Sequence, residues 1–172
     1  LFAKTAEYPC ILRFSSGSAT RKPDNEPDVR GLGVRLLDPH DKKSPLGQDF
    51  VLTSTPTMPL GTVRDFYEAV HYLVDLHSPV SFAARMTATG RVGKLVQLQL
   101  ARGTPDSLLV MPWYSATPFK LGESLQVKYK FAPALENAWA STHERGASYL
   151  TENLAKSLGE KTTPPLAFNV CV

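Results

Sequence analysis

The sequence has few cysteines, no long apolar run and no strong excess of either charge. It contains two cysteines, Cys10 and Cys171, and no Cys-x-x-Cys or cysteine–histidine cluster, so no zinc site is predicted. No stretch approaches the roughly 18 apolar residues that cross a bilayer, so no membrane span is expected. The net charge is +3, and the lysines and arginines are scattered along the chain. This distribution is typical of a solvated surface and disfavours nucleic acid as a partner.

Each cysteine lies in an apolar run and is expected to behave as a small, buried, free thiol. A disulfide between them would need two edge strands that bring Cys10 and Cys171 together. The chain starts at Leu1 without Met and stops at Val172 inside a predicted strand, which we interpret as a piece of a longer protein. Nothing in the sequence identifies a compartment, and a soluble intracellular protein is the expectation.

What is present suits one domain over residues 1–172. The chain is 42% hydrophobic, which is enough for a single core. Apolar alternation bounded by Gly and Pro predicts strands, and apolar spacing of three and four residues predicts helices. The predicted strands are 8–16, 32–37, 50–53, 124–131 and 166–172, with a short extended segment at 113–117; the predicted helices are 63–74, 80–86, 92–101 and 144–158. This order predicts an α+β protein with a mostly antiparallel sheet or barrel.

The helix that starts near Val63 carries an apolar stripe, and this stripe predicts Phe66 as a core residue. Thr62 is the expected N-cap, with Asp65 three residues later as its partner. The following helical stretch, 80–101, is rich in apolar residues. Such a stripe is typical of a core or a subunit contact, although it could also line a route for an apolar ligand.

Five segments in register resemble the core barrel of the catalase superfamily, and in particular its short catalase-like haem proteins and hydroperoxide-metabolising members. An Arg-Phe-Ser or an Asp-x-Arg-Gly motif alone occurs by chance, but the order and spacing match over nearly the whole chain. The resemblance implies a catalase-like antiparallel β-barrel with flanking helices. The matching segments are Ile11 to Ser15, Pro27 to Arg35, Gln48 to Val51 with Thr55-Pro56, Trp113 to Phe119, and Gly122 to Tyr129.

The resemblance also implies a pocket for haem b at the side of the barrel. Arg13 matches an arginine that pairs with a haem propionate, a role that suits a guanidinium because it is always charged and has fixed donors. Ser15 matches a serine that orients the distal histidine. Val29 matches a residue of the substrate channel beside the acidic Asp28, and Phe66 matches an aromatic that stacks on the haem. Without the resemblance, we would interpret Arg13 as a surface residue and Ser15 as a strand residue with no special role.

The chain departs from the family at its catalytic groups. The distal histidine would precede Leu1, and none of the four histidines is placed to replace it. Thr53 stands where the family has a distal asparagine, and its hydroxyl could donate one hydrogen bond to a peroxide but cannot copy an amide. The tyrosinate that holds catalase iron would follow Val172, and none of the six tyrosines is nominated as a ligand. No other metal ligand is predicted.

Two functions therefore stay open. One is a haem-dependent oxidoreductase of the peroxidase or catalase type that acts on hydrogen peroxide or on organic (lipid) hydroperoxides. The other is a catalase-fold structural or interaction subunit that has lost haem and activity. The resemblance further implies self-association as a homo-oligomer or within a larger assembly.

Overall fold

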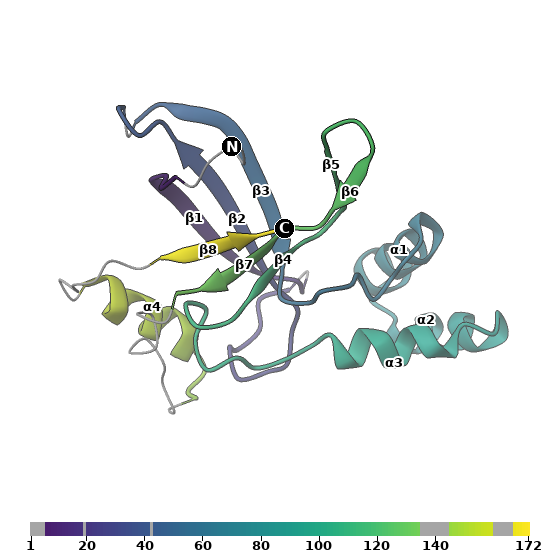
Figure 1. The fold of residues 1–172 in the computed structure, drawn as a ribbon. Helices are drawn as coiled ribbons and strands as arrows, with labels where there is room; N and C mark the ends of the chain where they lie inside the picture. The colour runs from purple at the N-terminus through teal and green to yellow at the C-terminus, as the bar shows by residue number, and fades with distance from the viewer. Residues whose placement is uncertain (1–5, 19, 42, 135–144, 160–166) are drawn as a thin grey trace.

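The computed structural model describes residues 6–18, 20–41, 43–134, 145–159 and 167–172 (Figure 1). These residues form a sheet, a projecting group of helices and a helix near the C-terminal end. In chain order the elements are β1 (Cys10–Ser16), β2 (Arg30–Leu37), β3 (Pro45–Thr53), α1 (Val63–Val70) with a π-helical turn η1 (His71–Asp75), α2 (Pro79–Ala88), α3 (Val92–Leu100), β4 (Trp113–Ser115), β5 (Phe119–Leu121), β6 (Leu125–Val127), β7 (Lys130–Pro133), α4 (Tyr149–Gly159) and β8 (Phe168–Cys171).

The main sheet has six strands in the order β1-β2-β3-β4-β7-β8, and every neighbouring pair is antiparallel. The sheet curls into a half-barrel, and the hairpin of β5 and β6 extends from it (Figure 1). The predicted α+β class and antiparallel sheet are thus confirmed. A closed catalase-like barrel is not formed by the described strands, because β1 and β8 pair only with their inner neighbours and remain the two edges.

One face of the sheet carries the main core. Residues 30–36 of β2 alternate, with Leu32, Val34 and Leu36 buried while Arg35 between them is exposed. The register places the buried Leu52 and Phe50 of β3 opposite Leu32 and Val34. This alternation is the period of two expected for a sheet with one packed face. Further core residues come from β4, β7, α4 and the loops next to them: Leu108, Trp113, Tyr129, Phe131, Tyr149 and Leu150.

The loop between β1 and β2 attaches α4 to this core. The Asp24 carboxylate accepts hydrogen bonds from the backbone N–H groups of Leu150 at 3.1 Å and Thr151 at 3.4 Å. These groups belong to the first turn of α4, where backbone donors have no partner inside the helix. Asp24 therefore caps a helix that begins more than 120 residues later in the sequence.

Helices α1 to α3 form a separate group that projects away from the sheet (Figure 1). Their own core is small and consists of Ala69, Phe82 and Met86, with Tyr72 and Leu73 of η1 packed against it. The expected N-cap is confirmed, since the Asp65 N–H donates to the Thr62 hydroxyl at 3.1 Å.

The orientation of α1 contradicts the sequence-based expectation. Its charged residues Asp65 and Glu68 are buried, whereas Phe66, predicted as core, is 52% exposed. The apolar stripe of α1 thus points to solvent, because the inward face is occupied by ion pairs with α2 and with the turn before α3. The apolar residues of the stretch 80–101 are only partly in the core. Phe82 and Met86 are buried, whereas Val96 and Leu100 are exposed.

Three further expectations differ from the structure. The predicted strand 124–131 is divided into β6 and β7, which belong to different sheets. Cys10 and Cys171 are free, but both are exposed rather than buried, because they lie on the edge strands β1 and β8. The last helix, predicted over 144–158, begins at Tyr149, and Glu144 at the start of the predicted range lies outside the described residues.

Candidate functional site

Four of the five predicted site residues share the face of the sheet that lies opposite the core. Residues directly opposite in an antiparallel pair point to the same face. Ser15 is opposite Gly31, and Gly31 is opposite Thr53, so these three residues form one row across β1, β2 and β3. We call the side of these strands that carries this row the polar sheet face.

Arg13 belongs to the next row of the polar sheet face, with Gly33 and the exposed Val51. Val29 lies two residues before Gly31, so alternation along the strand direction places it on the same face. The β1–β2 pairing continues to this point, because the Val29 carbonyl accepts a hydrogen bond from the Gly17 N–H at 2.8 Å. The sheet thus brings together Arg13, Ser15, Val29 and Thr53, which come from segments up to 40 residues apart in sequence.

Two glycines form the floor between these side chains. A Cβ on Gly31 would come within 2.6 Å of the Ser15 hydroxyl, so glycine permits Ser15 to lie over the backbone of β2. A Cβ on Gly33 would meet only atoms of Arg13 at 3.9 Å, which is ordinary contact. Because neither glycine projects a side chain, a flat ligand could approach the strand backbone here.

Thr53 is already engaged by its own loop. Its hydroxyl donates to the carbonyl oxygen of Thr55 at 2.9 Å. A hydroxyl has one proton to donate but two lone pairs, so Thr53 in this arrangement can accept a hydrogen bond from a ligand and cannot donate one. Donation to a peroxide, the predicted role, would require this hydroxyl to rotate away from Thr55.

Asp28 is the residue that the resemblance matches to an acid of the substrate channel. Its side chain is buried and accepts hydrogen bonds from the backbone. Its carboxylate accepts hydrogen bonds from the N–H groups of Ser18 at 3.1 Å and Val29 at 2.9 Å. Its backbone also pairs with Gly103. These contacts hold the loop between β1 and β2, and they place Val29 at the border of the polar sheet face.

Arg30 organises the same loop from the core side. Its guanidinium donates to the Ser16 hydroxyl at 2.6 Å and to the carbonyl oxygens of Asp24 at 3.1 Å and Glu26 at 3.3 Å. Arg30 is buried, and it lies opposite Ser16 on the packed face. The two arginines of the predicted signature are thus separated: Arg30 is structural, and Arg13 is exposed on the polar sheet face.

Phe66, the fifth predicted residue, lies on α1 and not on the strands of the polar sheet face. The row that contains Thr53 continues instead into residues that the sequence reasoning missed. Tyr114 is opposite Thr53, and Lys130 is opposite Tyr114. Tyr114 could have been found from its buried neighbours Trp113 and Ser115, since alternation places it on the other face.

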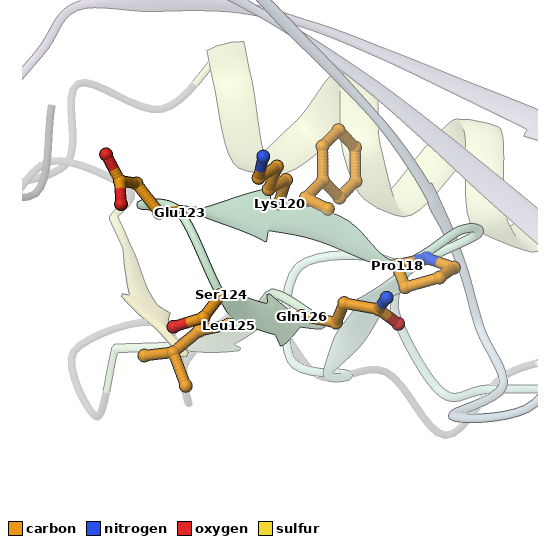
Figure 2. Close-up of a pocket in the computed structure, with 7 residues that line it drawn as sticks. Pro118, Lys120, Glu123, Ser124, Leu125 and Gln126 are labelled. Atoms are coloured by element: carbon orange, nitrogen blue, oxygen red, sulfur yellow. The ribbon is translucent and has the colours of Figure 1, made fainter.

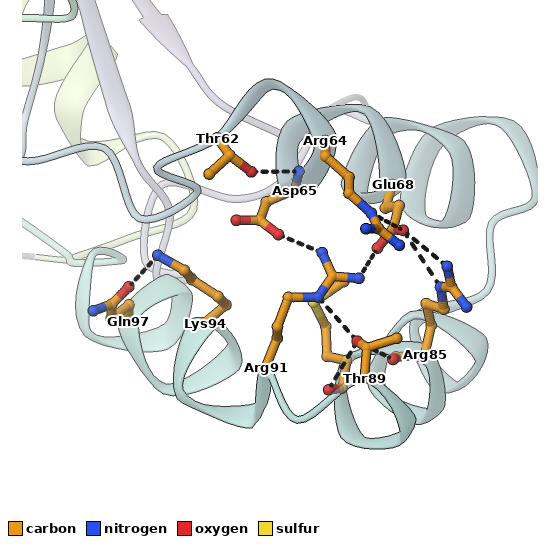
Figure 3. Close-up of polar contacts among 10 residues, drawn as sticks. Thr62, Arg64, Asp65, Glu68, Arg85, Thr89, Arg91, Lys94 and Gln97 are labelled. Atoms are coloured by element: carbon orange, nitrogen blue, oxygen red, sulfur yellow. Dashed lines mark hydrogen bonds and ion pairs between the residues drawn. The ribbon is translucent and has the colours of Figure 1, made fainter.

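A second cluster of charged groups lies between the helices (Figure 3). Arg91 forms ion pairs with Asp65 and Glu68, and Glu68 also accepts from Arg85 at 3.2 Å and Arg64 at 3.3 Å. Burial alone would raise the pKa of Glu68, but hydrogen bonds from the three arginines outweigh it and lower that pKa. Hydrogen bonding to Thr62, and then to Arg91, lowers the pKa of Asp65.

Buried carboxylates with shifted pKa values can mark an active site. Here the partners come from the protein itself: Arg91 donates to the Asp65 carboxylate, and both carboxylate oxygens of Glu68 accept from arginines. A general acid or base needs a position open to substrate. We therefore interpret this cluster as a structural connection between α1, α2 and the start of α3.

Two depressions lie elsewhere. One of about 300 Å³ is formed by the β5–β6 hairpin, between Pro118 and Gln126 (Figure 2). Another of about 540 Å³ lies between the β1–β2 loop and the start of α4, and it is lined by hydroxyl groups and by Arg21 and Lys22. None of the five predicted site residues lines either depression. The polar sheet face lies outside both depressions.

The described histidines lie away from the polar sheet face: His40 is in the loop after β2, and His71 pairs with Asp75 at 3.5 Å on η1. His143 lies outside the described residues. Within the described ranges, no group of three or more His, Cys, Asp or Glu side chains could hold a metal ion. In the same part of the chain, no helix has the length and apolar character that a membrane crossing requires.

Comparisons of the chain with protein-family models and with curated proteins found no match. The described fold defines a class: an α+β protein whose curled antiparallel sheet is packed on one face and carries an exposed arginine, hydroxyl groups and glycines on the other.

Proposed function

We propose that the polar sheet face binds haem b and that the protein is a catalase-like oxidoreductase acting on hydrogen peroxide or organic hydroperoxides. The observation that supports this proposal is the gathering of Arg13, Ser15, Val29 and Thr53 on one face. These four residues are the ones that the resemblance to catalases assigns to the haem pocket and the substrate channel. Their common face is what a shared ligand requires.

The chemistry of the face suits a flat, acidic, largely apolar ligand. Arg13 is exposed, and no ion pair to it is found among the described side chains, so its guanidinium is free to bind a propionate. Gly31 and Gly33 leave the strand backbone accessible, while Val29 and Val51 offer apolar surface. Ser15 and Thr53 supply hydroxyl groups at the end of the same face.

Bound haem would supply the iron at which a hydroperoxide O–O bond is broken. The residues of this chain would bind and orient the ligands around it. No tyrosine is proposed as the iron ligand: Tyr129 and Tyr149 are buried in the core, and burial raises the pKa of Tyr149, which opposes formation of a tyrosinate. The Tyr149 hydroxyl also donates to the Pro105 carbonyl.

Haem titration of the full chain, followed by absorption, tests the proposal. We expect a Soret band that saturates near one equivalent. Arg13→Ala should weaken haem binding about tenfold, as expected for loss of a charge-assisted hydrogen bond. Arg35→Ala is the matched control, because Arg35 lies on the same side of the sheet but is already paired with Asp49 at 2.9 Å. Protein that stays colourless with haem supplied would refute haem binding.

A second candidate function is an interaction subunit that keeps the fold without haem. It is favoured by the Thr53 hydroxyl, which is committed to Thr55, and by the exposed apolar side of α1. The same titration separates the two functions. Equal spectra for the wild type, Arg13→Ala and Arg35→Ala, all without a Soret band, would support the interaction subunit.

A further inference from the structure

The amphipathic helix α1 is inverted relative to an ordinary surface helix. Its charged residues are inside: Asp65 is 3% exposed and Glu68 is 7% exposed. Its apolar residues are outside, and they continue onto η1. We call this exposed stripe the α1 stripe; it consists of Val63 (89% exposed), Phe66 (52%), Tyr67 (66%), Val70 (37%) and Val74 (39%).

The opposite side of α1 is fully occupied, so the stripe cannot turn inward. Asp65 and Glu68 are held by Arg91 and Arg85 from the neighbouring helical segments (Figure 3). Rotating α1 would break these ion pairs and leave buried charges without partners, which is strongly unfavourable. A contiguous exposed apolar stripe on a rigid element is typical of a surface that another molecule covers.

The charges at the ends of the stripe indicate what covers it. A helix favours negative side chains in its first turn and positive ones in its last turn, because of its dipole. The exposed residues here are reversed: Arg64 is in the first turn of α1, and Asp75 ends η1, with side chains 68% and 61% exposed. Their pairs within the helix, with Glu68 and His71, also have the less favourable order of basic before acidic residue.

Arg64 and Asp75 interact unfavourably with the dipole of their own helix, but they would interact favourably with an antiparallel second copy of that helix. Beside a reversed second helix, Arg64 would lie near the negative C-terminal end and near the Asp75 carboxylate of the other copy. By two-fold symmetry the second pair would form as well. The apolar residues of the stripe, spaced by three and four positions, would meet along the seam between them.

We propose that the α1 stripe is the interface of a two-fold symmetric homodimer in which the α1–η1 helices of two copies pack antiparallel. This proposal does not depend on haem binding. The continuous helix 63–75 is about 20 Å long. A seam of that length buries less than a standard interface, so the dimer should be weak and concentration-dependent, with a Kd on the order of micromolar.

Sedimentation equilibrium of the full chain tests the proposal, and charge reversal tests the geometry. We expect a monomer–dimer equilibrium between about 1 and 200 µM. Arg64→Glu alone, or Asp75→Arg alone, places like charges at both symmetric contacts and should raise the Kd about tenfold. The double variant Arg64→Glu with Asp75→Arg restores opposite charges and should recover most of the affinity.

Two variants locate the interface. Tyr67→Glu puts a charge into the stripe and should abolish the dimer within this concentration range. Leu100→Glu is the matched control, since Leu100 is 81% exposed on the neighbouring α3 outside the stripe, and it should leave the Kd unchanged. Circular dichroism melting identifies any variant that fails to fold, and the Kd comparison is made among the folded ones.

Three outcomes would overturn the proposal. The wild type could stay monomeric at the highest concentration, including the case in which it binds lipid vesicles through the stripe. The Leu100→Glu variant could lose the dimer while Tyr67→Glu keeps it, which would locate the interface on α3. The double charge reversal could be as weak as the single ones, which would exclude the antiparallel arrangement.

Discussion

At the scale of single residues, several side chains act through partners that are distant in sequence. Arg30 and Asp28 lie in the segment Pro27 to Arg35 that resembles the catalase barrel. In the structure, Arg30 donates to the loop carbonyls of Asp24 and Glu26, and Asp28 accepts from the backbone N–H groups of Ser18 and Val29. Together they fix the loop from which Asp24 reaches α4. The conformation of this one loop therefore decides where a helix near the other end of the chain begins.

Asp24→Ala should lower the free energy of unfolding by about 1 kcal/mol, because it removes the cap of α4. Asp24→Asn is the matched control, since asparagine also accepts hydrogen bonds from the first turn of a helix. Urea denaturation followed by circular dichroism measures both variants. Equal destabilisation by Ala and Asn would show that the charge of Asp24, rather than its cap, is what matters.

Gly33→Leu should block a ligand on the polar sheet face and leave the fold intact. A side chain here meets no close atoms, and it would project between Arg13 and Val51. We expect haem affinity to fall at least as much as with Arg13→Ala, while the melting temperature stays within a few degrees of the wild type. Gly93→Leu, in an equally open position on α3, is the control and should not affect haem binding.

At the scale of elements, α1 shows how ion pairs can decide which side of a helix is buried. The sequence pattern of α1 contains an apolar side and a charged side, and patterning alone predicts the apolar side as buried. The tertiary structure reverses this because Arg91 and Arg85 neutralise the carboxylates of Asp65 and Glu68. A buried charge is tolerated when it is paired and hydrogen-bonded.

This arrangement predicts an acid-sensitive helical group. Because the folded-state pKa values of Asp65 and Glu68 are lowered, their contribution to stability is complete above the unfolded values. It is lost as the pH falls below about 4, through the folded values. Melting curves between about pH 3 and pH 7 should show this loss, and Asp65→Asn should flatten the acid limb.

Asp49→Asn provides the comparison for the acid limb. The pKa of Asp49 is also lowered by Arg35, but this pair is exposed on the sheet and should contribute little. An acid limb that is equally steep in the wild type and in Asp65→Asn would contradict the role assigned to the buried pairs.

At the scale of the whole molecule, the described residues form two separate hydrophobic clusters. The larger one joins the packed face of the sheet to α4, with Trp113 fully buried at its centre. The smaller one lies within the helical group around Met86, which is also fully buried. A small cluster stabilised largely by ion pairs should open at a lower free energy than a sheet core.

Met86→Ala should therefore destabilise the helical group selectively, by about 2 to 5 kcal/mol. Hydrogen exchange should show faster exchange in α1, α2 and α3 and nearly unchanged exchange in β2 and β3. Trp113→Ala is the counterpart and should lower protection throughout the chain, since it empties the centre of the larger cluster. Uniform loss of protection in Met86→Ala would show that the two clusters unfold as one unit.

The sequence alone determined what depends on local pattern. Sequence alone predicted the period-two alternation of β2, the helices α1 to α3 from their apolar spacing, and the Thr62 cap. Each of these features depends on neighbours within a few residues. The pattern also placed Arg13, Ser15 and Thr53 on strands. Their common face could not be read with certainty, because it depends on the register between strands, and a slip of one residue exposes the opposite set of side chains.

Only the tertiary structure decided the features that depend on distant partners. The cap from Asp24 to α4 joins residues 126 positions apart. The ion pairs of Arg91 bury the charged side of α1 and leave its apolar side exposed. The open sheet, with β1 and β8 as its edges, likewise follows from pairing between strands rather than from their composition. Local sequence determined where the helices and strands form. The free energy of burying and pairing their side chains determined which faces became the core, the polar sheet face and the α1 stripe.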